Sequence, residues 1–490
     1  MSKTSDQRGP GFWRALPLLT VLAMGLASTA CDFLDPTEVE NPRTTDEDLA
    51  QADEPTAALL PGLENAFATA LDNVVIISEC VSDNYAIHGT GLDSDWDFPN
   101  DITPDITNRG EAHYSPVQDL NGLAHFVLND IIPEDETATA GDIAWAHYYQ
   151  GMAYVFLAEN FSGAPVEEDG LPLSPGQILE LAIAEFNQAV SGGGDVGLAA
   201  NLGLARAYRW LGNASQASSA ATQVLATDPQ FYLGQEYDAN SNQNSAASYL
   251  VFRALQEMQP LPRLDFLDPK YTTRDAEIPF AKAEEAHLIL AEIALASSDW
   301  TAGKGHLADA IRLAQSRGTL SWVDDDARNN SDLTIRPRDS EIQVRADADS
   351  PYRSGLIQDR NGALTTQYVI SGSSLDADSV EALPNGDPGA IWHAFWLARQ
   401  EIFFLEGRRQ ADLGIRLPMR KREYEQNPNI SVGDLGTVGV VPSYIPSSRN
   451  MDLYDPATPY DEGENLTTTF VTIDYDMNKI LVQNNVSPFQ

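Results

Sequence analysis

Residues 199–229 read AANLGLARAYRWLGNASQASSAATQVLATDP, and this stretch decides the fold. Small and apolar side chains recur in it at three- and four-residue spacing, which is the period of an α-helix. Leu211-Gly212-Asn213 interrupts the pattern with residues that are typical of a turn between helices. The stretch therefore predicts two helices that are joined by a tight turn.

The same stretch matches the tetratricopeptide pattern of paired antiparallel helices. The signature positions are occupied by Leu204, Ala205, Tyr208, Ala217, Ala221 and Pro229. An alanine on each helix lets the two backbones approach closely, and the tyrosine fills the gap beside them. Two residues depart from the pattern, namely Asn201, where tryptophan is usual, and Val224, which replaces a small residue.

Similar patterns lie on either side of this stretch. A second pair is predicted over 284–313, with its turn at Ser297-Ser298-Asp299. A third is split by a loop rich in glycine and proline, with helices at 148–159 and 175–190. Further helices are predicted over 391–413 and over 54–75, the latter interrupted near Pro61-Gly62. The sequence thus predicts a mainly α protein built on tetratricopeptide-like helix pairs.

Long stretches without helical periodicity separate these pairs. The scaffold occupies about 142–225, 280–315 and 390–413, and loop-rich insertions occupy about 80–140, 230–275, 318–390 and 415–490. Insertions of this length in a compact domain are usually functional. We therefore expect them to cover one face of the scaffold and to carry the ligand site.

Composition excludes several classes of protein. The chain has 72 acidic and 30 basic side chains and a formal charge of −42, which argues against nucleic-acid binding. Its 43% hydrophobic content is that of a folded protein. With 2 cysteines, it has neither a disulfide framework nor a cysteine-built zinc site.

The N-terminus has the pattern of an export signal. Basic residues precede a short apolar run, and Ser28-Thr29-Ala30 leads to Cys31. This resembles the lipobox of bacterial lipoproteins, although leucine is usual where Ser28 stands. We expect residues 1–30 to be removed, Cys31 to be acylated, and residues 31–490 to form a single mature domain. Several acyl chains on Cys31 would form a stable membrane anchor.

Residues 399–413 read RQEIFFLEGRRQADL. Together with DFLDP after Cys31, NFSG at 160–163 and the two helix pairs, this segment resembles the SusD/RagB family of outer-membrane lipoproteins. The segment departs from the family pattern at Ala398-Arg399-Gln400, where Glu-Arg is usual, and lacks a tryptophan after Leu413.

This resemblance implies a binding protein with four helix pairs. Members of the family sit on the cell surface, cap a SusC-type TonB-dependent transporter, and pass oligosaccharides or peptides to it. They are not enzymes and need no cofactor. We therefore expect this chain to lie at the outer membrane, held by its lipid, with such a transporter as its partner.

The 399–413 segment itself is interpreted as structural. A glutamate and an arginine one helical turn apart can pair, and an arginine near a helix C-terminus complements the helix dipole. We expect a fold-locking network made of Arg399, Glu401, Glu406, Gly407, Arg409 and Asp412. The six basic side chains between 408 and 422 would either pair internally or form a docking patch.

Sugars are bound by aromatic faces and by planar polar groups in concave sites. The candidate ligand residues on the first insertion are Asp83, Asn84, Tyr85 and Trp96, and those on the 318–390 insertion are Trp322, Tyr352 and Arg353. The alternative for each aromatic side chain is that it packs its loop onto the scaffold.

No metal site is predicted. Asp93, Asp95 and Asp97 alternate as in a calcium loop, but Phe98 and Pro104 stand where such a loop needs glycine and glutamate. The seven histidines show no zinc-ligand spacing, and GxSxG, GxxxxGK[ST] and CxxC motifs are missing. Two alternatives to nutrient binding stay open: an anchored scaffold that binds only proteins, and an anchored hydrolase built on paired carboxylates.

Overall fold

The protein is described from a computed structural model. It describes residues 53–85, 96, 98–110, 113–249, 261–323, 342–358, 364–446, 451, 454–456 and 470–490. The predicted signal at 1–30, the predicted lipid attachment at Cys31 and the alternating acids Asp93, Asp95 and Asp97 lie outside this range. Residues Asp53–Gln490 group into one compact unit.

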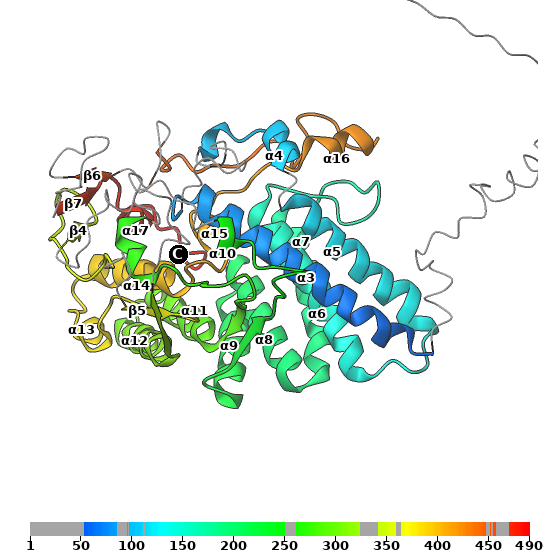
Figure 1. The fold of residues 1–490 in the computed structure, drawn as a ribbon, viewed down its shortest axis with the longest axis horizontal. Coiled ribbons are helices and arrows are strands. Elements are labelled where there is room, and N and C mark those ends of the chain that lie inside the picture. The colour runs from blue at the N-terminus through cyan, green and yellow to red at the C-terminus, as the bar shows by residue number, and fades with distance from the viewer. Residues whose placement is uncertain are drawn as a thin grey trace, which may run out of the picture. The chain divides into compact units, whose positions relative to one another are not determined.

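Helices dominate the described residues, which confirms the predicted fold class (Figure 1). The longer helices are α3 (Pro55–Val81), α5 (Tyr114–Phe126), α6 (Ala140–Asn160), α7 (Pro175–Ala189), α8 (Gly194–Trp210), α9 (Ala214–Thr227), α11 (Ala283–Ala296), α12 (Trp300–Ser316) and α14 (Pro388–Ile402). The shorter ones are α4 (Pro104–Gly110), α10 (Ala246–Tyr249), α13 (Ala377–Glu381), α15 (Arg409–Asp412), α16 (Lys421–Gln426) and α17 (Met477–Gln483).

The predicted helix pairs are present. α6 packs on α7, α8 on α9, and α11 on α12, and contacts between α7 and α8 and between α9 and α11 join the pairs in order (Figure 1). In the central pair, Gly212 makes the turn at φ 68°, and the Asn213 side chain caps α9 by accepting from the Gln216 backbone N–H. The turn at 211–213 is therefore built from the residue types that predicted it.

Close approach between the pairs depends on residues without a side chain. Gly151 on α6 and Gly203 on α8 both face the ring of Phe186 on α7. A Cβ atom at either glycine would lie 2.7 Å or 2.6 Å, respectively, from that ring. Because such distances are far below van der Waals contact, the ring fits only where both glycines leave room.

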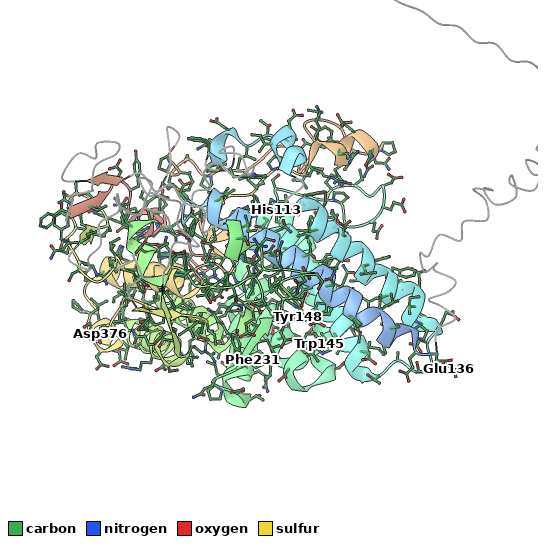
Figure 2. All side chains as sticks on the ribbon, in the orientation of Figure 1. His113, Glu136, Trp145, Tyr148, Phe231 and Asp376 are labelled. Atoms are coloured by element: carbon green, nitrogen blue, oxygen red, sulfur yellow. The ribbon has the colours of Figure 1, made fainter. Side chains whose placement is uncertain are left out.

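Aromatic side chains fill the space where α3 meets α6. The ring of Phe67 on α3 lies 6.0 Å from that of Phe156 and 5.2 Å from that of Phe280. Tyr148, which Figure 2 labels beside Trp145 on α6, is 1% exposed and meets the Trp145 ring edge-on at 5.5 Å. This cluster forms a core between the first helix and the first pair.

Two helical predictions need correction. α3 is continuous, although Pro61 removes a backbone donor inside it, because the helix buries a long apolar face that runs to Val81. The helix predicted over 391–413 instead ends at Ile402 and resumes as α15 at Arg409. Between them, Leu405 (φ 57°) and Gly407 (φ 68°) adopt left-handed backbone that no helix contains.

Helix α5 was not predicted, since it lies inside the 80–140 insertion. It packs against both α3 and α6, so this part of the insertion extends the helical layer rather than covering it.

The strands anchor the insertions at their ends. β1 (Tyr232–Gln235) pairs with β2 (Ile278–Lys282), and β3 (Thr319–Val323) pairs with β5 (Leu364–Tyr368), both antiparallel. A third sheet has the order β4 (Gln343–Arg345), β7 (Phe470–Ile473), β6 (Tyr454–Pro456), with β4 parallel to β7. This sheet brings the 318–390 insertion against the C-terminal one.

Candidate functional site

Two adjoining cavities lie where these two insertions meet α14. One, of about 620 Å³, opens between α13, α14 and α17, and the other, of about 170 Å³, reaches from α14 to the segment 344–356. Both are lined by Ser350 and His393, so they form one space, which we call the α14–α17 cleft. Its size suits a ligand of a few sugar rings or a short peptide.

A histidine and an aspartate are joined by a hydrogen bond in this cleft. His393 Nε2 on α14 lies 2.7 Å from Asp476 Oδ2, and Arg263 donates to Asp476 Oδ1 at 3.1 Å. Asp476 also caps α17 by accepting from the backbone N–H of Asn478. Burial would raise the pKa of Asp476, but the His393 hydrogen bond and the Arg263 charge together hold it well below its usual range. The cleft therefore contains a fixed carboxylate.

The smaller cavity is lined by a second buried carboxylate. Glu401 on α14 accepts from the Ser373 hydroxyl and the Ser374 backbone N–H, both at 2.8 Å. Arg353 donates from Nη2 to the Ser374 carbonyl at 3.1 Å and hydroxyl at 3.0 Å. Arg353, for which the sequence predicts ligand contact, thus lies at the cleft wall. Its guanidinium is held by the loop that Glu401 anchors.

An exposed aromatic pair stands at the rim of the cleft. Tyr352, between the cleft residues Pro351 and Arg353, is 36% exposed, and its ring lies 4.9 Å from that of Phe470, which is 41% exposed. The Arg345 guanidinium lies 4.7 Å from the Tyr352 ring centre. We call Arg345, Tyr352 and Phe470 the rim platform.

Backbone hydrogen bonds between paired segments position the rim platform. Val344 and Arg353 exchange backbone hydrogen bonds of 2.8 and 2.9 Å, and β4 holds the hairpin against β7, which carries Phe470. The platform is therefore presented by paired strands, and its aromatic faces are held in a defined arrangement.

The four candidates on the first insertion lie elsewhere and are buried. Asn84 is 1% exposed and bonds Glu79 at 2.9 Å and Gln400 at 2.8 Å. Tyr85, also 1% exposed, donates to Asp268 Oδ1 at 2.5 Å. Asp83 accepts from the Met451 backbone N–H, and Trp96 (3% exposed) packs edge-on against His113 at 6.0 Å.

These contacts favour the packing alternative for Asp83, Asn84, Tyr85 and Trp96. Asn84 ties the end of α3 to α14, and Tyr85 and Asp83 bond Asp268 and Met451, respectively. All four side chains present almost no surface to a ligand. The backbone of Trp322 lies in β3, and its side chain is outside the described residues, so its ligand contact stays a prediction.

The 399–412 motif forms a buried network of charges. Arg399 donates to Asp412 Oδ2 at 2.7 Å, and Glu406 Oε1 lies 2.5 Å from the ammonium groups of both Lys270 and Lys282. Gly407 is required by its φ of 68° and by Val74, whose Cγ1 would lie 2.9 Å from an added Cβ.

Arg409 is buried at 3% exposure, and burial lowers the pKa of its guanidinium to about 9. Of the other basic residues between 408 and 422, Arg408 is buried and Lys421 pairs with Asp105. These contacts fit internal pairing better than a docking patch.

Neither of two serines that line the cleft donates its hydroxyl to the cleft histidine. Ser350 and Ser379 each donate to a nearby aspartate, Asp347 or Asp376, instead of to His393. Sequence reasoning missed His393, Asp476, Phe470 and Arg345 because the cleft is assembled from segments far apart in the chain. The one local signal was Asp476, which stands as an N-cap before a short apolar helix.

Comparisons with known proteins give structural neighbours only. No family model and no curated protein matches the sequence. Among solved structures, a SusD superfamily protein from Bacteroides fragilis is 11% identical with a TM-score of 0.47, and the match covers 73% of this chain and 87% of that chain. A SusD superfamily protein from Bacteroides vulgatus is 13% identical with a TM-score of 0.45, and the match covers 77% and 90%. A SusD-like carbohydrate binding protein from the same species is 12% identical with a TM-score of 0.42, and that match covers 73% and 82%.

Among the described helices, none combines the length and the apolar character needed to cross a membrane.

Proposed function

We propose that this chain is a surface lipoprotein that binds oligosaccharides and delivers them to a SusC-type TonB-dependent transporter. The observation that carries the binding half is the rim platform beside the α14–α17 cleft. Exposed aromatic rings beside a mainly apolar cavity that holds a few polar side chains are the groups that glycans require, because sugar C–H faces stack on aromatic rings and hydroxyls need planar polar partners. The delivery half and the lipid anchor rest on the sequence resemblance and on Cys31.

The charges of the cleft favour a neutral glycan over an acidic one. Asp476 is held ionised, and Asp376 and Asp387, which line the same cavity, are engaged as helix caps. With a chain charge of −42, these carboxylates repel uronic-acid or sulfated chains. The cationic side chains of the cleft are already engaged, Lys479 with Asp347, Arg263 with Asp476 and Arg353 with Ser374. The carboxylates can accept hydrogen bonds from hydroxyl groups, which neutral sugars supply in number.

A peptide ligand is the second candidate, since carboxylates in the cleft would also attract a basic peptide. The feature that favours the glycan is the pair of exposed rings, Tyr352 and Phe470, which are inclined at 64° and each leave ring surface open for a sugar.

The test is a calorimetric titration of the full-length protein, purified in mild detergent, with neutral oligosaccharides, acidic oligosaccharides and short peptides. Each mixture is then assayed for cleavage. We expect binding of neutral oligosaccharides and recovery of every ligand uncut. Cleavage would contradict the proposal in favour of an anchored hydrolase. Binding of proteins alone, with no glycan or peptide bound, would contradict it in favour of a protein scaffold.

A further inference from the structure

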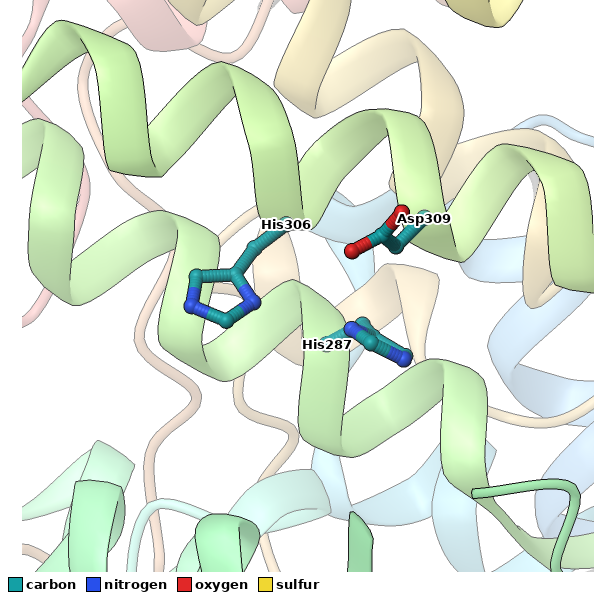
Figure 3. Close-up of side chains that lie close together, drawn as sticks. All are labelled: His287, His306 and Asp309. Atoms are coloured by element: carbon teal, nitrogen blue, oxygen red, sulfur yellow. The ribbon is translucent and has the colours of Figure 1, made fainter.

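A cluster of metal-binding side chains lies outside the α14–α17 cleft, between the two helices of one pair. His287 on α11 and His306 and Asp309 on α12 each offer one ligand atom, and these atoms lie within 4.8 Å of one another (Figure 3). The sequence did not predict this site, because His287 lies on a different helix from the other two. Only His306 and Asp309, three residues apart, share a helix face in the sequence.

The two imidazoles have unused nitrogens. Nδ1 of His287 and Nδ1 of His306 are both buried and have no hydrogen-bond partner among the described residues. A buried ring nitrogen without a partner is costly, and either a proton donor or a metal ion would satisfy it. The two rings lie 5.9 Å apart at 45°, which brings them close without stacking.

The Asp309 carboxylate is the third candidate ligand beside the two imidazoles. Asp309 lies beside Arg312, but at 3.4 Å this is the longest of the three acidic contacts of Arg312, which reaches Asp378 at 2.8 Å and Glu381 at 3.0 Å. The guanidinium is thus directed mainly to α13, and Asp309 stays available to a cation.

We propose that His287, His306 and Asp309 form a site for a divalent transition-metal ion of the zinc class, which joins α11 to α12. Two imidazoles and one carboxylate are typical ligands for zinc, with a water in the fourth position, whereas calcium and magnesium prefer oxygen ligands alone. Zinc bonds of about 2.05 Å at tetrahedral angles place ligand atoms about 3.3 Å apart. Metal binding at this site therefore requires the ligand atoms to move together from a spread of up to 4.8 Å.

This site does not depend on the proposed function, since it lies on the scaffold and shares no residue with the α14–α17 cleft. Its test is therefore separate. The full-length protein in detergent is freed of metal with a chelator and titrated with Zn²⁺ by calorimetry, and with Co²⁺ while the visible absorption is recorded. Calcium at millimolar concentration is present throughout to occupy oxygen-only sites.

We expect one high-affinity Zn²⁺ per chain and a visible Co²⁺ band of tetrahedral intensity. His306→Gln and Asp309→Asn should each weaken Zn²⁺ binding at least about tenfold, because even outer-shell partners of metal ligands contribute 10–100-fold. His147→Gln is the matched control, since this histidine also pairs with a carboxylate, and it should bind Zn²⁺ as the wild type does.

Two results would overturn the proposal. One is a wild-type protein that binds no Zn²⁺ above the level of the calcium-blocked background. The other is full affinity in Asp309→Asn, whose side chain is exposed and whose folding is checked by circular dichroism.

Discussion

Replacing Glu406 with glutamine tests the buried charge network most sharply. Glu406 Oε1 lies 2.5 Å from Lys270 Nζ and 2.5 Å from Lys282 Nζ, and all three side chains are at most 4% exposed. Glutamine keeps the shape but removes the negative charge between two buried ammonium groups. Breaking one buried pair costs about 3–5 kcal/mol, because the charge left behind is neither solvated nor paired.

Two features of the structure act on this loss of stability in opposite directions. Two lysines lose their partner, which places the expected loss of unfolding free energy in the upper part of that range. Burial already lowers the pKa of Lys270 to about 8, so this lysine can release its proton once Glu406 is gone, and that release limits the loss. We therefore expect Glu406→Gln to lose about 3–5 kcal/mol at pH 7, with a smaller loss at pH 9.

The assay is urea unfolding followed by tryptophan fluorescence. Glu168→Gln, an exposed glutamate on the loop before α7, serves as the control and should change the unfolding free energy by less than about 0.5 kcal/mol. The double variant Glu406→Gln/Lys270→Met should recover part of the loss, since one unpaired ammonium is removed with its partner. A loss below about 1 kcal/mol in Glu406→Gln, or a double variant less stable than the single one, would refute the reasoning.

Three further outcomes follow from the same contacts. Gly407→Ala should lose about 2 kcal/mol in unfolding free energy, since φ is 68° and a Cβ would lie 2.9 Å from Val74. Asn84→Ala should lose about 1–3 kcal/mol by leaving Gln400 without its acceptor, yet bind ligand with unchanged affinity. Burial raises the pKa of Asp72 from 3.8 to about 6, so the folded state holds this proton more tightly. Its stabilising contribution is present below about pH 3.8 and is lost as the pH rises through 6. In urea unfolding across this range, the difference between wild type and Asp72→Asn should therefore change by about 3 kcal/mol.

The helix pairs could be predicted from sequence because they are local. Each pair needs small residues at fixed spacing and a turn residue such as Gly212, and these signals lie within one stretch of about 30 residues. The break after Ile402 was not predicted, because the 399–413 segment has helical periodicity throughout. Only the packing of Gly407 against Val74 shows why the backbone must turn there.

The site could be predicted only in part. Tyr352 and Arg353 were chosen because they are aromatic and polar residues on a long insertion. Arg353 lines the cleft and Tyr352 lies next to it in the chain, and ligand contact by either stays a prediction. Phe470, His393 and Asp476 reach the cleft through β7, α14 and α17, and pairing between distant strands leaves no local pattern in sequence. Asn84 was predicted to bind ligand because it is a polar residue that follows a helix. Such a side chain can join a buried hydrogen-bond network as readily as it can bind a sugar.

The most direct test of the binding account compares the rim platform with an aromatic residue elsewhere. The double variant Tyr352→Ala/Phe470→Ala and the control Tyr424→Ala on α16 are titrated with a neutral oligosaccharide that the wild type binds. Loss of two stacking faces should weaken affinity by about 2 kcal/mol, or roughly thirtyfold, in the double variant, with the control unchanged. Wild-type affinity in a folded double variant would contradict the central claim that ligand binds at this cleft.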